Sequence, residues 1–245
     1  MTQPISMPWS KPIFPPLPHS WRGVRIAALP FAPRPGSVER ILPPGMEPAE
    51  GPGVLTLLCY PESDFQLHPF NEFVVMVPVR VDDVVGTYIP HIYVNTDEAL
   101  IPGREIAGFP KLLAEVRWER EGASFRGSVT RWGECIFEVE GELQGPLPEA
   151  VANAQRESAS RPSLNYKLIP DPAGGIAIEE ITKTQLEIVA REQEIGQARF
   201  RARTTPWDAL ADVVPDAEGP LIVVLSDNTI PAGETLKQIK RKATA

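Results

Sequence analysis

The sequence on either side of Gly133 constrains the fold most strongly. Residues 124–132 (SFRGSVTRW) and 134–143 (ECIFEVEGEL) both alternate polar or charged side chains with apolar ones. A period of two is the pattern of a strand with one buried and one solvated face. Because only one glycine separates the two stretches, this region predicts an antiparallel β-hairpin.

Further strand-like runs, rich in β-branched and aromatic residues, recur along the chain. They occupy residues 53–60, 72–81, 86–94, 164–170, 198–203 and 219–233. Pro78 lies inside the second run and marks a bulge or an edge position, because proline donates no backbone hydrogen bond. Residues 175–196 are ambiguous, since they begin with strand alternation and end in a Glu- and Gln-rich stretch that could be helical.

Few segments have the pattern of a helix. Residues 36–42 combine a serine cap with an apolar stripe, residues 205–214 start with a threonine and a proline, and residues 232–242 close the chain. Residues 144–163 are polar, so we expect a long exposed loop with one helical turn. The predicted fold class is therefore mainly β (α+β), antiparallel with a few short helices, as one domain over residues 1–245.

Proline is unusually common in this chain. There are 28 prolines, about twice the ordinary share. Many of them cluster in residues 8–20 and 30–53. Proline is excluded from the interiors of helices and central strands, so we interpret these segments as connections and edge elements around a core.

Composition argues against several classes of protein. The net charge of −8 and the pI of about 5.1 lack the basic footprint of a nucleic-acid binder. No run of eighteen apolar residues predicts a membrane helix, and the N-terminus lacks a secretory pattern, so a cytoplasmic location is expected by default. Cys59 and Cys135 lie in apolar runs and are expected to be buried free thiols.

Motifs for metals, cofactors and common nucleophiles are missing from the sequence. His68 and Glu72 have the spacing of two ligands on a helix, but Pro69 lies between them and a strand follows. No phosphate-binding or dinucleotide-binding glycine motif occurs, and no nucleophile elbow. Neither cysteine has the basic neighbours that activate a thiol. The sequence therefore predicts neither a metal site nor these kinds of catalysis.

Lys111 lies in an apolar neighbourhood, IPGREIAGFPKLLAEV (residues 101–116). Lysine is among the least buried residue types, so two interpretations are open. In the commoner one, the stem crosses an apolar surface and the ammonium group stays in water. In the other, loss of water favours the neutral amine, which can then attack a ketone and form an iminium.

Three stretches resemble the acetoacetate decarboxylase family. GREIAGFPK (103–111) resembles the family signature, in which Lys111 has the position of the Schiff-base lysine. HPFNEFVVMVPV (68–79) resembles the segment that carries the catalytic glutamate, here Glu72, which precedes the lysine by 39 residues (111 − 72). RPSLNYKLIPDPAGGIAIEEITK (161–183) is similar to a third family segment, so the resemblance covers nearly the whole chain.

The resemblance implies a single β-rich domain, curled into a cone or closed barrel around the lysine, that assembles into homo-oligomers. It also implies a lyase without a cofactor, which decarboxylates acetoacetate or a related small β-keto acid through an iminium on Lys111. Glu72 would position the substrate or shuttle a proton. Arg104 and Glu105 match the signature and are expected to orient the loop that carries the lysine.

Substrate-binding residues also follow from the resemblance. Family members hold the substrate carboxylate with an N-terminal arginine, which here corresponds to Arg22 or Arg25, and a bidentate guanidinium suits that role. Phe109 and Leu112, on either side of the lysine, would provide apolar contacts.

Two departures from the family pattern bear on the reaction. The decarboxylases carry a second lysine where this chain has Leu112, so activation of Lys111 would rest on loss of water alone. They also place an acidic residue on the strand before Glu72. That position falls near Leu57 here, with Glu62 as a displaced substitute.

These departures leave alternative functions open. One is a Schiff-base aldolase or dehydratase acting on pyruvate or another keto acid. Tyr88, Tyr93 and Tyr166 could supply the hydroxyl for such chemistry, although tyrosine is also an ordinary strand residue. Another is a non-catalytic member that binds a small acid.

Overall fold

The strands of this protein join into one large sheet. The computed structural model describes residues 5–61, 63 and 67–239. The strands are β1 (His19–Phe31), β2 (Glu47–Pro48), β3 (Gly53–Tyr60), β4 (Phe70–Val81), β5 (Val84–Val94), β6 (Lys111–Leu113), β7 (Glu115–Glu121), β8 (Ser124–Arg131), β9 (Glu134–Pro146), β10 (Ser163–Asp171), β11 (Gly175–Thr184), β12 (Glu187–Ala202), β13 (Ala217–Ile230) and β14 (Glu234–Gln238).

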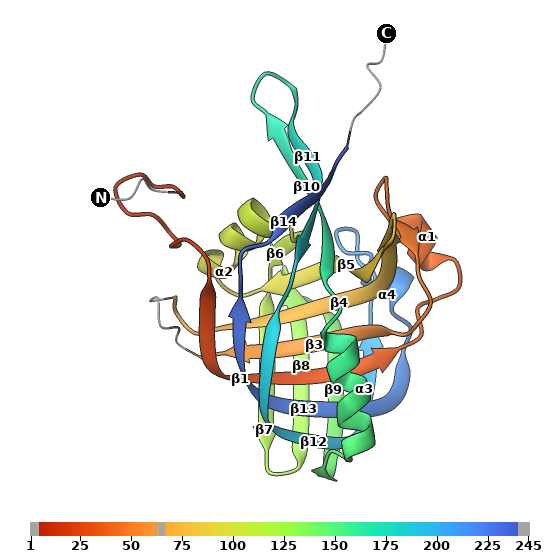
Figure 1. The fold of residues 1–245 in the computed structure, drawn as a ribbon. Helices are drawn as coiled ribbons and strands as arrows, with labels where there is room; N and C mark the ends of the chain where they lie inside the picture. Colours follow the sequence, from red (N-terminus) through yellow and green to blue (C-terminus); the bar gives the residue numbers. More distant parts are fainter. Residues whose placement is uncertain (1–4, 62, 64–66, 240–245) are drawn as a thin grey trace.

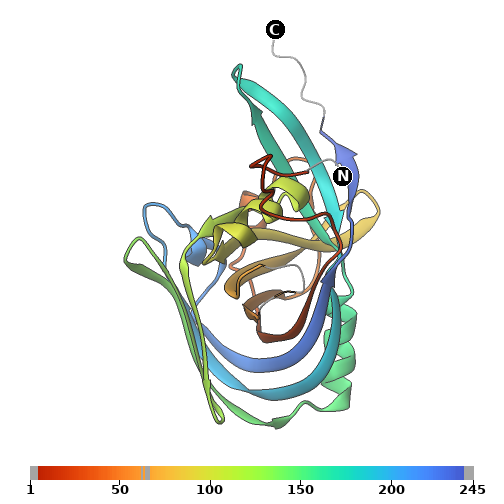
Figure 2. The same ribbon diagram turned by 90° about the vertical axis from the view of Figure 1, so that its left-hand side faces the viewer.

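The sheet is curved into an open cone. Its main path runs β14-β11-β10-β5-β4-β3-β1-β13-β12-β9-β8-β7, with β2 beside β4 and β6 beside β5. Its strand pairs are antiparallel except β10 with β5 and β6 with β5. Because β14 and β7 lie at opposite ends of the path, the cone predicted by the resemblance is present and the closed barrel is not (Figures 1 and 2).

Short helices connect and cover the strands. They are α1 (Ser37–Ile41), α2 (Asp97–Pro102), the π-helix η1 (Gly103–Ala107), α3 (Glu149–Ala159) and α4 (Leu210–Val213). α2 and η1 lead directly into β6. α3 lies against β12 (Figure 1), where Gln193 Nε2 donates a 2.9 Å hydrogen bond to Gln155 Oε1.

The central strands are apolar on both faces, and the two faces meet different surroundings. Leu57 and Phe73 belong to a cluster of fully buried side chains that the outer strands cover. The ring of Phe73 stacks on Phe137 of β9 at 4.4 Å between centroids. On the opposite face, Leu58 and Val74 belong to a second apolar cluster. Leu58 and Val74 also line a cavity. We therefore call the first face the packed face and the second the cavity face.

The predicted hairpin is confirmed as β8 and β9. Arg131 pairs with Glu134, so Trp132 and Gly133 form the two-residue turn. Both have positive φ, 50° and 84°, as a type I′ turn requires. The other predicted strand runs are also present. β3 has the predicted ends, the remaining strands have shifted ends, and residues 36–42 contain α1 as expected.

Two expectations about secondary structure are wrong, and one ambiguous segment is resolved. The described part of the predicted helix 232–242, residues 232–239, contains the strand β14, which pairs with β11. Residues 144–163 contain the eleven-residue helix α3 rather than a loop with one turn. Within 175–196, both β11 and β12 are strands, so the helical interpretation of its Glu- and Gln-rich end fails. At β14 and β12, pairing with neighbouring strands outweighs local propensity.

Two further elements differ from expectation. The proline-rich N-terminal region also contains β1, a central strand between β3 and β13, which is not an edge element. Only residues 210–213 of the predicted helix 205–214 are helical. At its start the Thr205 hydroxyl accepts bonds from the backbone N–H groups of Trp207 and Asp208.

Both cysteines are free thiols, and both are partly buried. Burial raises the pKa of Cys59, and nearby Arg25 has the opposite, smaller effect. Among the described residues, the helices are too short and too polar to cross a membrane.

Candidate active site

Lys111 is the first residue of the short strand β6. It pairs in parallel with Ile92 of β5, which fixes the direction of its side chain. A tight turn precedes it, since the N–H of Lys111 donates to the carbonyl of Phe109 at 2.8 Å. The sheet therefore holds the lysine at the cavity face instead of leaving it on a loop.

Glu72 of β4 lies directly beside the lysine. Lys111 Nζ donates to Glu72 Oε2 at 2.5 Å, and each side chain is only 9% exposed. Breaking a buried ion pair by removing one partner is costly, because the remaining charge has no compensation. Lys111 and Glu72, 39 positions apart in the sequence, thus form one buried ion pair.

Two glycines of the signature shape the loop that carries the lysine. A Cβ added at Gly103 would lie 2.6 Å from both Cδ and Cε of Lys111, so the absent side chain makes room for the lysine stem. Gly108 ends the π-helix with φ of 77°, a left-handed conformation that favours glycine. A π-helical turn often marks a functional site.

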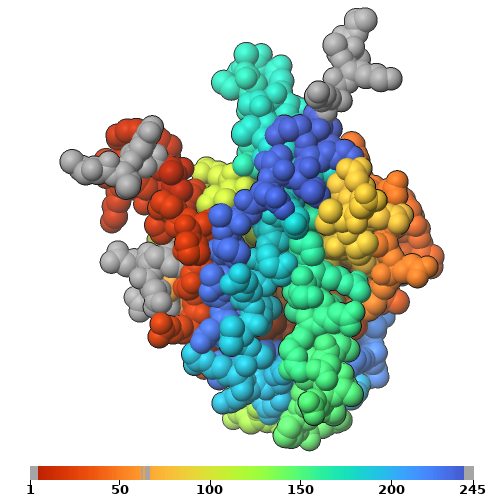
Figure 3. Space-filling view, in the orientation of Figure 1, coloured from red at the N-terminus to blue at the C-terminus, as the bar shows by residue number. Residues whose placement is uncertain are grey.

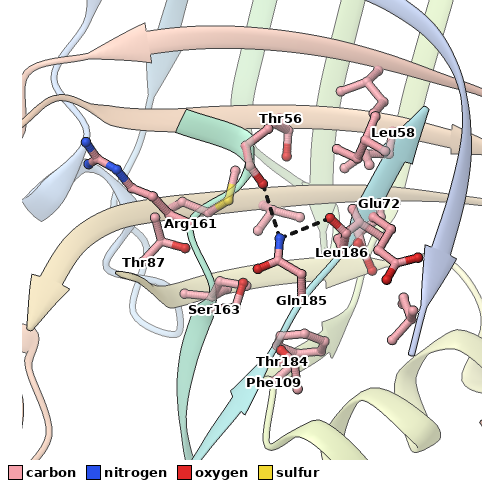
Figure 4. A pocket seen from close by; sticks show the side chains of 18 of the residues that line it. Thr56, Leu58, Glu72, Thr87, Phe109, Arg161, Ser163, Thr184, Gln185 and Leu186 are labelled. Atoms are coloured by element: carbon pink, nitrogen blue, oxygen red, sulfur yellow. Dashed lines mark hydrogen bonds between the residues drawn. The ribbon is translucent and has the colours of Figure 1, made fainter. Parts of the chain in front are cut away.

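The lysine and the glutamate line a large cavity of about 1280 Å³. An aromatic group of Trp21, Tyr60 and Phe70 forms one part of its wall, with Tyr60 stacked on Phe70 at 4.4 Å between centroids. Figure 4 shows Glu72, Leu58 and Phe109 among the residues that line it. The wall around the reactive pair is mainly apolar.

Tyr60 provides a hydroxyl group in this apolar wall. Burial, followed by the charge of Glu72, raises the pKa of the Tyr60 phenol well above its ordinary value, and the Asn228 side chain opposes the shift. The phenol therefore keeps its proton at neutral pH and can donate a hydrogen bond. Sequence reasoning did not single out Tyr60, because the apolar run LTLLCY hides which residues share a face with Glu72.

The residues that flank the lysine divide between two environments. Phe109 lines the cavity, with its ring centroid 5.8 Å from Lys111 Nζ. The expectation that Leu112 contacts the substrate is corrected, because its side chain packs against the packed face and does not line the cavity. Successive residues of a strand point to opposite faces, so a lysine at position 112 would also point away from Lys111.

Arg104 binds the backbone of Lys111. Its Nη1 donates to the carbonyl of Lys111 at 3.1 Å, which fits the structural role expected of it. Glu105 is exposed and forms no ion pair within the part of the chain that the structure describes, so the expected Arg104–Glu105 pair is not formed.

The two candidate arginines of β1 lie elsewhere, which corrects the expectation that one of them holds the substrate carboxylate. Arg22 and Arg25 are exposed and do not line the cavity. β1 has an irregular register between Trp21 and Val24, and this bulge keeps Trp21 and Ile26 on the cavity face. Arg25 instead lies over the ring of Trp118 at 5.8 Å.

The strand before Glu72, β3, carries no acidic residue, as the sequence indicated. Leu57 is fully buried on the packed face, and its cavity-lining neighbours are Thr56 and Leu58. Glu62 lies outside the described residues.

The three tyrosines considered from the sequence do not line the cavity either. Tyr93 donates to Asp208 on the far side of the sheet, and Tyr166 bonds to Glu179. Burial raises the pKa of Tyr88 to about 12. Of the four tyrosines in the chain, Tyr60 is the one that the cavity reaches.

The chemistry available at this site is that of an amine and a carboxylate in an apolar chamber. The described residues include no group of three His, Cys, Asp or Glu side chains placed to hold a metal ion. An amine in hydrogen-bond contact with a carboxylate can lose its proton to that carboxylate and then act as a nucleophile. The arrangement fits carbonyl chemistry through an iminium.

Comparison with known proteins gives a consistent result. The family model described as acetoacetate decarboxylase (ADC) matches residues 2–239. "Acetoacetate decarboxylase 3" of Mesorhizobium japonicum is 25% identical over 96% of this chain and 91% of its own length. The acetoacetate decarboxylase of Clostridium botulinum is 22% identical over 99% and 98%.

Solved structures share the fold. The acetoacetate decarboxylase of Legionella pneumophila superposes with a TM-score of 0.86 at 22% identity, over 96% of this chain and 94% of its own. The enduracididine biosynthesis enzyme MppR, solved with the condensation product of pyruvate and imidazole 4-carboxaldehyde, gives a TM-score of 0.81 at 15% identity over 97% of both chains.

Proposed function

The chain belongs to the acetoacetate decarboxylase family, and from this premise we propose that it is a Schiff-base lyase that decarboxylates a β-keto acid without a cofactor. The observation that carries the proposal is the buried pair of Lys111 and Glu72, 2.5 Å apart in the wall of an apolar cavity. Curated relatives named acetoacetate decarboxylase support the same reaction class.

The first step forms the covalent intermediate. Glu72 takes a proton from the Lys111 ammonium group, and the neutral amine attacks the ketone carbon of the substrate. Glu72 returns this proton to the carbonyl oxygen, which gives a carbinolamine. It then transfers a second proton from the carbinolamine nitrogen to the hydroxyl group, which leaves as water. The product of this step is an iminium between Lys111 and the former ketone carbon, and its positive charge lies beside the Glu72 carboxylate.

The second step releases carbon dioxide. The bond to the substrate carboxylate breaks, and its electron pair moves to the iminium nitrogen to give an enamine. An apolar wall favours this step, because the charged carboxylate is poorly solvated there and the departing molecule is neutral. A proton delivered through Glu72 to the enamine carbon, followed by hydrolysis, returns the free lysine. To the Tyr60 hydroxyl, which also lines the cavity, we assign the role of donating a hydrogen bond to Glu72 or to the substrate carboxylate.

Borohydride trapping tests this proposal. Sodium borohydride reduces an iminium to a stable amine, so incubation with acetoacetate should add mass to the protein at Lys111, as mapped by peptide digestion. Lys167, which also lines the cavity, provides an internal control and should stay unmodified. The Lys111→Met variant should give no adduct. Wild-type protein that gives no adduct with any keto acid would indicate a binding protein without this chemistry.

A second candidate is condensation of a keto acid with an aldehyde. It is favoured by one observation, the protonated Tyr60 hydroxyl in the cavity wall, which could serve an aldol addition and dehydration. The MppR complex named above shows such a condensation product in the same fold. Pyruvate with a panel of aldehydes should then yield a new product without release of carbon dioxide, and failure with every aldehyde would remove this candidate.

A further inference from the structure

The cavity extends far beyond the reactive pair. Along β4, four residues at alternate positions line it: Glu72, Val74, Met76 and Pro78. They span six residue steps of about 3.3 Å each, so the cavity follows this strand for roughly 20 Å. Thr56 and Val54 of β3 line the same stretch of the cavity, on the side of Leu58 away from Tyr60.

Arg161 marks the far end of the cavity. A Cβ added at Gly51 would lie 3.8 Å from Arg161 Nη1 and 3.9 Å from Pro78 Cγ, which places the guanidinium group close to the Pro78 end of β4. Figure 4 shows the same arrangement, with Arg161 and Thr87 on one side of the pocket and Glu72 and Leu58 on the other. Arg161 is exposed, so this end opens to solvent.

Most of the side chains that α3 contributes to the outer wall between the two ends are small or neutral. Ala154, Ser158 and Ala159 of α3 line this part of the cavity. Gln185 lies between the two ends in Figure 4 and is held by bonds of 3.3 Å from its Nε2 to the carbonyls of Ala159 and Leu186. Figure 3 shows α3 in green and β12 in cyan side by side over this region. The chamber is elongated and mostly uncharged along α3, although Arg156 of α3 and Glu187 of β12 also line it.

We propose that the substrate is an elongated keto acid, whose keto-acid end reacts at Lys111 and whose apolar chain lies along the cavity face of β3 and β4 toward Arg161. This inference rests on the proposed function and names its substrate class. Pockets for drug-sized ligands measure roughly 300–1,000 Å³, and this cavity of about 1280 Å³ exceeds that range. Acetoacetate is much smaller than such ligands and would leave most of the apolar wall in contact with water.

A series of 3-keto acids of increasing chain length tests the inference. For decarboxylation by wild-type protein, kcat/KM should rise about fourfold with each added CH₂, the ratio that corresponds to ~0.8 kcal/mol per buried CH₂. The rise should continue until the chain reaches the far end of the cavity. Values of kcat/KM that stay constant or fall from acetoacetate onward would overturn the inference.

A variant that obstructs the chamber sharpens this test. Met76 lies near the middle of the cavity wall, and Met76→Trp should lower kcat/KM for long chains relative to short ones by at least tenfold. Met76→Leu conserves volume and should keep the wild-type ratio. An unchanged ratio in Met76→Trp, in a protein whose circular dichroism matches wild type, would contradict the proposed path of the chain.

Trapping separates failure of this inference from failure of the proposed function. An adduct on Lys111 without any preference for chain length keeps the Schiff-base function and overturns the elongated substrate. No adduct with any keto acid overturns the function, and calorimetric titration with saturated fatty acids then decides the inference alone. Affinity that increases with fatty-acid length supports an elongated apolar site, and no binding removes it.

Discussion

The same central strands form both the packed face and the cavity face, and the two differ in what covers them. On the packed face, β7–β9 close over Leu57 and Phe73, which are fully buried. On the cavity face, Leu58 and Glu72 line the cavity. The comparison shows that an apolar strand surface becomes a core where a second layer reaches it, and a binding chamber where the covering elements are held away.

The largest effect should come from removing the reactive amine on the cavity face. Lys111→Met cannot form an iminium, so we expect complete loss of borohydride trapping and of carbon dioxide release. Removing one partner also leaves Glu72 buried without compensation, at a cost of about 3–5 kcal/mol in unfolding free energy. Urea denaturation measures this cost.

A double variant serves as the control for that prediction. Lys111→Met with Glu72→Leu removes both charges and should recover most of the lost stability, since apolar replacement of a buried pair is often neutral or stabilising. A double variant less stable than the single one would show that the two charges do not act as a pair.

Leu57 and Leu58 are adjacent in β3 and lie on opposite faces, so substitutions of the two allow a direct comparison of the faces. Leu57→Ala opens a void in close-packed surroundings and should cost about 3 kcal/mol of unfolding free energy. Leu58 already lines a cavity, so Leu58→Ala creates no new enclosed void. The loss of unfolding free energy should therefore be clearly smaller than for Leu57→Ala. Urea denaturation of both variants measures the difference, and equal costs would refute the distinction between the faces.

Restoring the second lysine of the decarboxylases tests the direction of residue 112. Leu112→Lys should place an amine toward the packed face, lower the unfolding free energy by about 1–3 kcal/mol, and leave the decarboxylation rate without any gain. Thermal denaturation and carbon dioxide release measure the two quantities. A faster reaction would indicate that residue 112 reaches the cavity.

Removing one hydroxyl from the cavity wall should have a smaller effect. Tyr60→Phe deletes the hydrogen bond that we propose to Glu72 or to the substrate carboxylate, and we expect kcat/KM to fall about tenfold, as for a bond to a charged group. The pH profile of kcat/KM should also shift. Tyr88→Phe, which is away from the cavity, is the matched control, and equal rates in the two variants would exclude a role for Tyr60.

The smallest effect concerns His19, which is buried in the cavity wall. Burial lowers the pKa of His19 in the folded protein below its ordinary value, against the opposite effect of a hydrogen bond with the Pro15 carbonyl. The unfolded chain therefore binds the proton more readily, so stability should fall as the pH drops below about 6.5. Urea midpoints at about pH 7 and about pH 5 should differ less in His19→Asn than in wild type, and an equal difference would contradict this assignment.

Much of the fold was predictable because its signals are local. The alternation on both sides of Gly133 and the positive φ available to glycine predict the β8–β9 hairpin. β1 was missed because its neighbouring prolines suggested connections, although its residues 20–29 contain none. β14 was missed because its pairing with β11 is a long-range contact that its own residues do not reveal.

The candidate site was predictable in part for a similar reason. Lys111 and Glu72 carry recognisable motifs, and the structure joins them. Arg22 and Arg25 could not be assessed from the sequence, because a bulge between Trp21 and Val24 decides which side chains of β1 face the cavity. Tyr60 escaped notice because its strand is apolar on both faces.

The sequence by itself determined that this chain forms mainly strands and that a lysine lies among apolar neighbours, because both signals are local. Only the tertiary structure decided which face of each strand is a core and which is a chamber. Consecutive residues such as Leu57 and Leu58 are chemically identical. Their different roles arise because the curvature of the sheet brings β7–β9 onto one face and holds the covering elements away from the other.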